Sequence, residues 1–262
     1  MRLTNKKALV TGASQGIGKA IALRLAEEGC TVVVHYHENL ADAEAVASEV
    51  RERGSEAYVV QANLSDVAQA SRLAEEAWEM VGSLDFLINN AGISYKKHFL
   101  DVTEADFDAF TNINFKSTTF LTQAVAQKMV AQNIAGSIYT ITSVNALRPG
   151  LGLSVYGATK GALETLMKGV AMELAPHGIR VNTLAVGAIE TELTRPVREN
   201  PELLKEVNDG IPAGRFGLPE EVAAVLVDLL ASGSYVTGAS VTIDGGLLLM
   251  RGYGKPGRYE GQ

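Results

Sequence analysis

The sequence predicts an α/β protein: a single doubly wound domain with a seven-stranded parallel sheet and helices on both faces. Short apolar runs alternate with longer helix-patterned segments, several of which end at a glycine, and no linker, repeat or low-complexity segment interrupts them. Strands that are apolar throughout indicate a parallel sheet that helices cover on both faces. The 262 residues, 47% of them hydrophobic, are enough to bury one large core.

The apolar runs give the order of the expected elements. They predict strands within residues 6–12, 31–36, 56–63, 84–92, 136–144, 179–186 and 239–246. Helical patterns occupy residues 17–29, 41–54, 66–82, 156–175 and 219–232. In a sheet of this kind ligands bind beyond the carboxyl ends of the strands, so the residues that follow each strand are the first candidates for a site.

Composition excludes several classes of partner. A formal net charge of −7 argues against a nucleic-acid or anionic-membrane partner, since neither attracts an acidic surface. The single cysteine, Cys30, excludes an internal disulfide and fits a reducing compartment. The N-terminal residues do not have the pattern of a signal peptide, and no run approaches 18 apolar residues. We therefore expect a soluble, cytoplasmic protein.

Two segments depart from the strand–helix alternation. Residues 187–217 form a polar insertion between the sixth strand and the last long helix, at the sheet edge where ligands bind. Their length and position suggest a mobile lid over a site. Residues 247–262 form a tail that begins with apolar residues and continues with glycine, tyrosine and basic residues. The tail is either disordered or docked on a neighbouring subunit, and the sequence does not choose between the two.

The segment "TGASQGIG" joins the first strand to the first helix. It contains Gly12, Gly16 and Gly18, which allow a tight turn and the close approach of a phosphate to the backbone. The helix N-terminus adds free N–H groups and the positive end of the helix dipole. An ordinary glycine turn is the alternative interpretation. The place of the turn after the first strand of a β-α-β unit favours dinucleotide binding.

The end of the second strand bears on the choice of dinucleotide. An acidic residue there would bind the adenosine ribose hydroxyls and repel a 2′-phosphate, but the sequence has Tyr36 at that position, followed by His37. The missing acid favours NADP(H) over NAD(H). Neither His37 nor Gln15 of the turn supplies a positive charge for the phosphate, and Glu38 comes one or two positions late.

The segment "SVYGATKGAL" carries the residues best suited to acid–base chemistry. Tyr156 and Lys160 are four residues apart and share one face of a helix. A free phenol has a pKa near 10. A neighbouring ammonium, together with the positive nicotinamide of an oxidised cofactor, is expected to lower that pKa towards 7, a change worth roughly 4 kcal/mol. The small residues Gly157, Ala158 and Gly161 are expected to leave room for cofactor and substrate. Chance spacing of a tyrosine and a lysine is the alternative.

Over essentially its whole length the sequence resembles the short-chain dehydrogenase/reductase family. The resemblance is carried by "TGASQGIG", "NNAG" at residues 89–92, Ser143, "YGATK" at 156–160, "IRVN" at 179–182 and "DGG" at 244–246. It implies a Rossmann-type fold, with residues 1–246 as the NAD(P)-binding catalytic domain. It also implies a homotetramer or dimer assembled through the two long helices before and after the strand that ends at Ser143.

The resemblance also implies roles for individual residues. Ser143 matches the serine that binds the substrate oxygen, with Thr142 as the weaker alternative. Asn114 matches an asparagine that holds a proton-relay water behind Lys160, with Asn112 as the competitor. The residues expected to bind the cofactor are Gly12, Ser14, Gln15, Gly16, Ile17, Gly18, Tyr36, His37, Asn63, Leu64, Asn90, Ala91, Gly92, Tyr156, Lys160, Gly187, Ile189 and Thr191. One departure is Val186-Gly187, where the family has Pro-Gly; losing the proline is expected to loosen the hinge of the lid.

These features predict an NAD(P)-dependent oxidoreductase that interconverts a ketone or aldehyde and a secondary alcohol. The expected reaction is NADPH-linked reduction of a 3-oxoacyl group or a small ketone, and the substrate is a small molecule. A sugar or polyol dehydrogenase of the glucose dehydrogenase type is the alternative. A non-catalytic, NADP-sensing regulator is a third possibility, but such proteins typically lose the tyrosine or the lysine. The scattered His35, His98 and His177 lack metal-ligand spacing, so no metal site is expected.

Overall fold

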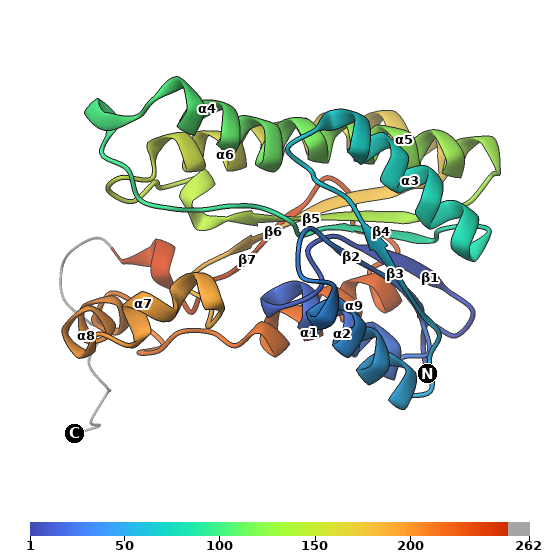
Figure 1. Ribbon diagram of the computed structural model, residues 1–262, viewed down its shortest axis with the longest axis horizontal. Helices are drawn as coiled ribbons and strands as arrows, with labels where there is room; N and C mark the ends of the chain where they lie inside the picture. The colour runs from blue at the N-terminus through green and yellow to red at the C-terminus, as the bar shows by residue number, and fades with distance from the viewer. Residues whose placement is uncertain (251–262) are drawn as a thin grey trace.

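The computed structural model of the chain describes residues 1–250 and contains one seven-stranded, all-parallel sheet (Figure 1). The strands lie in the order β3-β2-β1-β4-β5-β6-β7. Their bounds are Lys7–Val10 (β1), Thr31–Tyr36 (β2), Ala57–Gln61 (β3), Phe86–Asn89 (β4), Ser137–Ser143 (β5), Arg180–Val186 (β6) and Ser240–Ile243 (β7). The doubly wound α/β class and the seven parallel strands predicted from the sequence are thereby confirmed.

Nine α-helices connect these strands or follow them within the described residues. Their bounds are Gly16–Glu27 (α1), Leu40–Glu52 (α2), Val67–Val81 (α3), Glu104–Phe110 (α4), Ser117–Ala131 (α5), Ser154–Leu174 (α6), Arg195–Arg198 (α7), Pro201–Asp209 (α8) and Pro219–Ser232 (α9). Helices α4 and α5 are joined by a π-helical stretch, Thr111–Lys116. Figure 1 shows α1, α2 and α9 on one face of the sheet and α3, α5 and α6 on the other.

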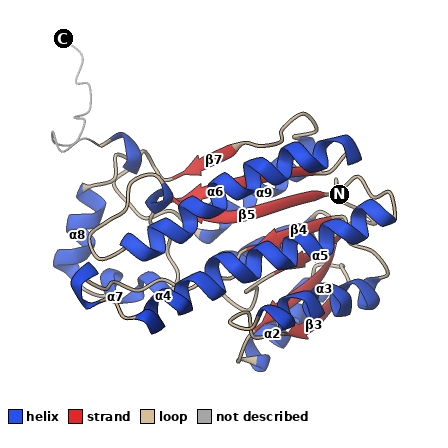
Figure 2. Ribbon diagram, turned by 90° about the horizontal axis from the view of Figure 1, so that it is seen from above, coloured by secondary structure: helices blue, strands red, loops and turns tan. Residues whose placement is uncertain are grey.

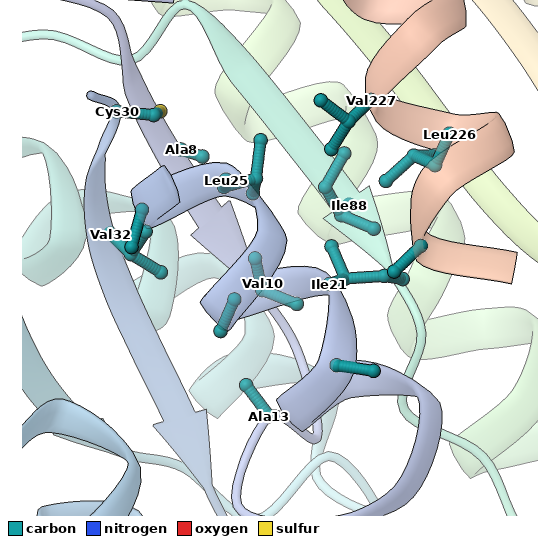
Figure 3. Close-up of a cluster of buried hydrophobic side chains, with 14 of the residues drawn as sticks. Ala8, Val10, Ala13, Ile21, Leu25, Cys30, Val32, Ile88, Leu226 and Val227 are labelled. Atoms are coloured by element: carbon teal, nitrogen blue, oxygen red, sulfur yellow. The ribbon is translucent and has the colours of Figure 1, made fainter. Parts of the chain in front are cut away.

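Alternate strand residues supply the two halves of the core. Val10 and Val32 point to the face covered by α1 and α9, where they pack with Ile21 and Leu226 (Figure 3). Leu9 and its neighbours on β2 and β4 point to the opposite face. Successive side chains of a strand point to opposite faces, so a strand buried on both sides must be apolar throughout. That requirement explains why continuous apolar runs identified this sheet.

Helix α6 lies against the second face of the sheet. Its residues Leu163 and Met167 are each 1% exposed and belong to the core on this side. The structure thus places this side of α6 against the sheet. Met172, near the C-terminal end of α6, is 79% exposed.

The polar insertion at residues 187–217 folds into two short helices, α7 and α8, after a 3₁₀ turn at Glu192–Thr194. Figure 2 shows α7 and α8 together beyond the carboxyl ends of the strands. Backbone hydrogen bonds fasten the base of the insertion, from Glu190 to Gly217 and from Gly217 to Ala188, each at 2.9 Å. From the predicted tail only residues 247–250 are described; the remainder lies outside the described residues.

Candidate active site

A cavity of about 580 Å³ lies over the carboxyl ends of β1 and β4. Between these two strands the connections change direction, since β1 leads to β2 on one side and β4 leads to β5 on the other. Such a switch point is the usual ligand site of a doubly wound sheet, and the volume is that of a typical ligand pocket. The predicted site residues that line it are Gly12, Ser14, Gln15, Gly16, Ile17, His37, Asn63, Leu64, Asn90, Ala91, Gly92, Tyr156, Lys160 and Thr191.

The glycine-rich turn forms one end of this cavity. Gly12 and Gly16 have φ angles of +60° and +55°, a region that side-chain-bearing residues rarely adopt. Gly18 does not line the cavity; it lies against the turn, and a Cβ there would be only 2.3 Å from the Gly12 carbonyl oxygen. Gln15 provides no side-chain cap for α1, and the first turn of α1 has no acidic residue. The N-terminus of α1 therefore retains the free N–H groups and positive dipole end that suit a phosphate.

The end of β2 differs from the sequence expectation. Tyr36 does not line the cavity, because its half-buried ring packs against the core under α1. The strand residue that lines the cavity is His35, which the sequence analysis treated only as a scattered histidine. Glu38, Asn39 and Asp42 also line this end. Successive side chains of β2 point to opposite faces of the sheet, so His35 rather than Tyr36 faces the cavity.

Tyr156 and Lys160 lie one turn apart on α6, and both line the cavity. The Lys160 Nζ atom donates to the Ile141 carbonyl oxygen at 3.0 Å and lies 6.0 Å from the centre of the Tyr156 ring. Burial lowers the pKa of Lys160 to about 8. Burial also raises the pKa of Tyr156, although a hydrogen bond with Ser143 opposes the rise. In this geometry desolvation of the phenolate outweighs the nearby ammonium, so the shift in the phenol pKa is opposite in direction to the one expected from Lys160.

The two candidate hydroxyls at the end of β5 have different partners. The Ser143 hydroxyl accepts from the backbone and side-chain nitrogens of Asn145, both at 3.1 Å, and bonds to Tyr156. Thr142 donates to the buried carboxylate of Glu164. Ser143 is thus the hydroxyl beside the phenol, although it does not itself line the cavity.

Asn114 lies in the π-helical stretch and is fully buried. Its side chain accepts from the Ile93 N–H at 2.8 Å and donates to the Ile93 carbonyl oxygen at 3.0 Å. Asn114 and Lys160 both lie next to Gly92. A Cβ built on Gly92 would be 3.0 Å from Asn114 Oδ1 and 3.4 Å from Lys160 Nζ. Asn112 is only partly buried, so the geometry favours Asn114 as the asparagine beside Lys160.

The remaining predicted residues shape the walls of the cavity. Asn90 donates to the carbonyl oxygens of Thr11 and Gly12 at 2.9 and 3.1 Å, which ties β4 to the turn. Gly187 and Ile189 do not line the cavity. A Cβ on Gly187 would lie 2.8 Å from Asp244, and Ile189 is 5% exposed within the core. These two residues therefore lie behind the cavity wall rather than on its surface.

The small residues around Tyr156 serve a different purpose from the one expected. Gly157 faces away from the cavity, and a Cβ there would lie 2.7 Å from the Asn145 carbonyl oxygen and 3.0 Å from Pro149. Gly161 likewise faces the backbone of Ala146, and Ala158 is exposed. The expectation that these residues make room for cofactor and substrate is wrong, because Gly157 and Gly161 let the loop after β5 pack closely on α6.

Several residues that line the cavity were not among the predicted site residues. They are His35, Ala62, Ser65, Ile93, Ser94, Ile113, Ile141, Val186 and Leu193. Some of them, such as Ile93 and Ser94, could have been predicted as lining residues because they come after a strand. Within residues 1–250, no group of His, Cys, Asp or Glu side chains could hold a metal ion. The same part of the chain contains no helix long and apolar enough to cross a membrane.

Comparison with known proteins agrees with this geometry. A family model described as enoyl-(acyl carrier protein) reductase matches residues 12–248. The chain is 35% identical to 2-dehydro-3-deoxy-D-gluconate 5-dehydrogenase of Dickeya dadantii, covering 94% of this chain and 96% of that protein. It is 37% identical to 3-oxoacyl-[acyl-carrier-protein] reductase of a Synechocystis species, covering 94% and 98%. A solved structure from Agrobacterium tumefaciens, a putative 2-deoxy-D-gluconate 3-dehydrogenase with bound NADP, superposes with a TM-score of 0.88 at 33% identity, covering 95% and 98%.

Proposed function

The chain belongs to the short-chain dehydrogenase/reductase family of NAD(P)-dependent enzymes that act on CH–OH groups, and we propose that it reduces ketones with NADPH. The observation that carries the proposal is the gathering of Tyr156 and Lys160 in one cavity with the glycine-rich turn, Ser143 being bonded to the phenol. A proton donor, its hydrogen-bond partner and a phosphate site are the parts that carbonyl reduction with a dinucleotide requires.

The described residues fit a dinucleotide. The positive-φ glycines Gly12 and Gly16 and the uncapped N-terminus of α1 suit its phosphates, and the cavity extends from them to Tyr156 and Lys160. Asn63 and Leu64 would contact the adenine side, and Lys160 and Thr191 the nicotinamide side. When bound, the cofactor supplies or accepts the hydride.

The remaining chemistry belongs to the side chains. Tyr156 gives its phenolic proton to the carbonyl oxygen in reduction and takes a proton from the alcohol in oxidation. Ser143 hydrogen-bonds the same oxygen and steadies it. Lys160 and Asn114 form the route by which a proton returns to Tyr156, since both lie next to Gly92. The insertion at residues 187–217 acts as the lid over the substrate.

We propose NADP(H) as the preferred cofactor. At the end of β2 the ring of Tyr36 packs into the core, so that position offers no carboxylate to bind a ribose hydroxyl. The Glu38 side chain is 86% exposed, and that of Asp42 bonds to Asn39. Both carboxylates line this end of the cavity, but neither stands at the β2 position where an acid binds the ribose hydroxyls. The bound NADP in the Agrobacterium relative supports the same preference.

For the substrate we propose a small ketone or 3-oxoacyl compound. A large acidic carrier protein would need a basic surface, but two of the basic residues near the cleft already have acidic partners. Lys97 pairs with Asp106 at 3.0 Å, and Arg195 pairs with Glu192 at 2.9 Å. Oxidation of a sugar or sugar acid is the second candidate, and the relatives from Dickeya and Agrobacterium favour it.

We further propose that the chain assembles as a homotetramer or dimer through α5 and α6. The outer sides of these helices expose Phe120 and Met172, which are 39% and 79% exposed. Size-exclusion chromatography with light scattering measures the assembly. A monomer at micromolar concentration would contradict this proposal without affecting the enzymatic one.

The test of function is a substrate panel measured in both directions. NADPH and NADH oxidation are followed with a 3-oxoacyl thioester and with small ketones, and NADP⁺ and NAD⁺ reduction with sugars and sugar acids. Tyr156→Phe is the control for each activity. The proposal predicts the fastest turnover with NADPH and a ketone, lost in the variant. Turnover only with NAD⁺ and a sugar would favour the second candidate, and binding of neither nucleotide would overturn both.

A further inference from the structure

His35 is part of the wall of the cofactor cavity, although nothing in the chemistry proposed above uses it. The residue lies near the end of β2, is 2% exposed and lines the cavity. Its ring joins two segments of the site. The Gly12 N–H donates to His35 Nδ1 at 3.0 Å, and His35 Nε2 lies 3.1 Å from the Ala62 carbonyl oxygen.

These two contacts fix the protonation of the imidazole. An N–H can only donate, so Nδ1 must present its lone pair to Gly12. A carbonyl oxygen can only accept, so Nε2 must carry the proton that points to Ala62. The ring is therefore neutral and held in one tautomer. Burial agrees with this state, since it lowers the pKa of His35 to about 4.

The two segments joined by the ring are the ones that would hold the phosphates and the adenine end of a bound dinucleotide. Gly12 is the first glycine of the phosphate turn, and the neighbouring Ala13 N–H donates to the His35 carbonyl oxygen at 2.9 Å. Ala62 precedes Asn63 and donates its own N–H to the Tyr36 carbonyl oxygen at 3.1 Å. The side chain of His35 thus crosses β2 and links the end of β1 to the end of β3.

We propose that His35 is a positioning residue for the dinucleotide, holding the phosphate turn and the adenine-side residues at a fixed separation through its two ring nitrogens. The proposal rests on the function proposed above, because it concerns the same cavity. His35 does not touch the reacting atoms. Its loss is expected to weaken cofactor binding and to leave turnover at saturating cofactor unchanged.

Two amide variants separate the roles of the two nitrogens. In His35→Asn the Oδ1 atom occupies the place of Nδ1 and can accept from Gly12, but nothing reaches Ala62. In His35→Gln the side-chain amide extends to the place of Nε2 and can donate to Ala62, but Gly12 loses its acceptor. His35→Ala removes both contacts. Because an unpaired buried N–H is the costlier loss, His35→Asn is expected to be the variant that rescues binding.

The first measurement is fluorescence titration of each variant with NADPH and NADH, together with kcat at saturating cofactor. His35→Ala and His35→Gln are expected to bind about tenfold more weakly or worse, and His35→Asn to stay within about threefold of the wild type, with kcat unchanged in all three. Equal weakening in the Asn and Gln variants, or unchanged binding in His35→Ala, would overturn the proposal. A fall in kcat at saturation would also overturn it.

The second measurement needs no cofactor. Hydrogen exchange of the peptide that contains residues 11–16 reports directly on the Gly12 turn. Exchange is expected to be faster in the Ala and Gln variants and unchanged in the Asn variant. If the wild type binds neither nucleotide, the function proposed above fails, and this exchange pattern still decides whether His35 holds the turn. If binding occurs and all variants exchange alike, the His35 proposal fails and the function stands.

Discussion

Gly18→Ala tests how closely helix α1 packs against the phosphate turn. A Cβ at residue 18 would lie 2.3 Å from the Gly12 carbonyl oxygen, 2.6 Å from Asn90 Nδ2 and 2.9 Å from the Ala13 Cα. Favourable separations between such atoms are about 3.5–4.0 Å, so the helix and the turn must move apart by about 1 Å. The Gly12 oxygen and the Ala13 Cα belong to the backbone, and Asn90 Nδ2 is held by two hydrogen bonds, so the added methyl group cannot be accommodated locally.

The cost can be worked out from these contacts. Overpacking of a tight site costs about 1–3 kcal/mol. The same displacement breaks the two hydrogen bonds by which Asn90 holds the carbonyl oxygens of Thr11 and Gly12, each worth about 1 kcal/mol. Gly18→Ala should therefore lower the free energy of unfolding by about 3–5 kcal/mol. It should also weaken NADPH binding, because the turn that receives the phosphates is displaced.

The assay is urea denaturation followed by circular dichroism, with NADPH titration on the folded variant. Gly169→Ala is the matched control: residue 169 is an exposed glycine within α6, and a Cβ there meets no atom within 4 Å. That substitution should raise stability by about 0.5–1 kcal/mol, because alanine is the better helix former. A Gly18→Ala variant with the wild-type denaturation midpoint and NADPH affinity would refute the packing argument.

Three further predictions test other parts of the molecule. Tyr156→Phe should lower kcat by about 10²–10⁴ while leaving the Kd for NADPH within about threefold, as steady-state kinetics and titration would measure. Glu164→Leu should cost about 1–3 kcal/mol more in urea denaturation than Glu164→Gln, because the Thr142 and Thr183 hydroxyls donate to this carboxylate; equal costs would contradict that. The pKa of His35 falls from its ordinary 6.5 to about 4, so the unfolded chain binds more protons between these values and stability rises with pH by about 3 kcal/mol across that window. Denaturation at pH 4.5 and pH 7 should show this gain in the wild type and lack it in His35→Asn.

The fold could be predicted because its determinants are local. Each strand is a short apolar run, and each is followed by a segment with helical periodicity, so strand count and direction follow from the sequence. The region from α4 to α5 is different. The chain at Thr111–Lys116 winds as a π-helix, which changes the spacing of the residues that face the sheet. A search for a 3.6-residue period therefore does not delimit these two helices.

The site could be predicted in part for the same reason. Tyr156 and Lys160 are four residues apart on one helix, and the glycine turn is a single short segment, so both are visible in the sequence. His35 was missed because its partners, Gly12 and Ala62, are 23 and 27 residues away. The role of Gly157 was misread for a similar reason, since Asn145 and Pro149 approach it from a separate loop.

The direction of the Tyr156 pKa shift cannot be predicted from residue spacing alone. The Lys160 ammonium lies 6.0 Å from the ring, where its attraction for a phenolate is worth about 3 kcal/mol at an effective dielectric constant of 20, or about two pKa units. Full burial of an ionisable group shifts its pKa by up to about 3–5 units in the opposite direction. The second effect prevails here: burial raises the pKa of Tyr156, and Lys160 donates to the Ile141 carbonyl oxygen rather than to the phenol. Helical spacing therefore identifies the acid–base pair, but the sign of the pKa shift depends on burial and on hydrogen bonds with residues of strand β5.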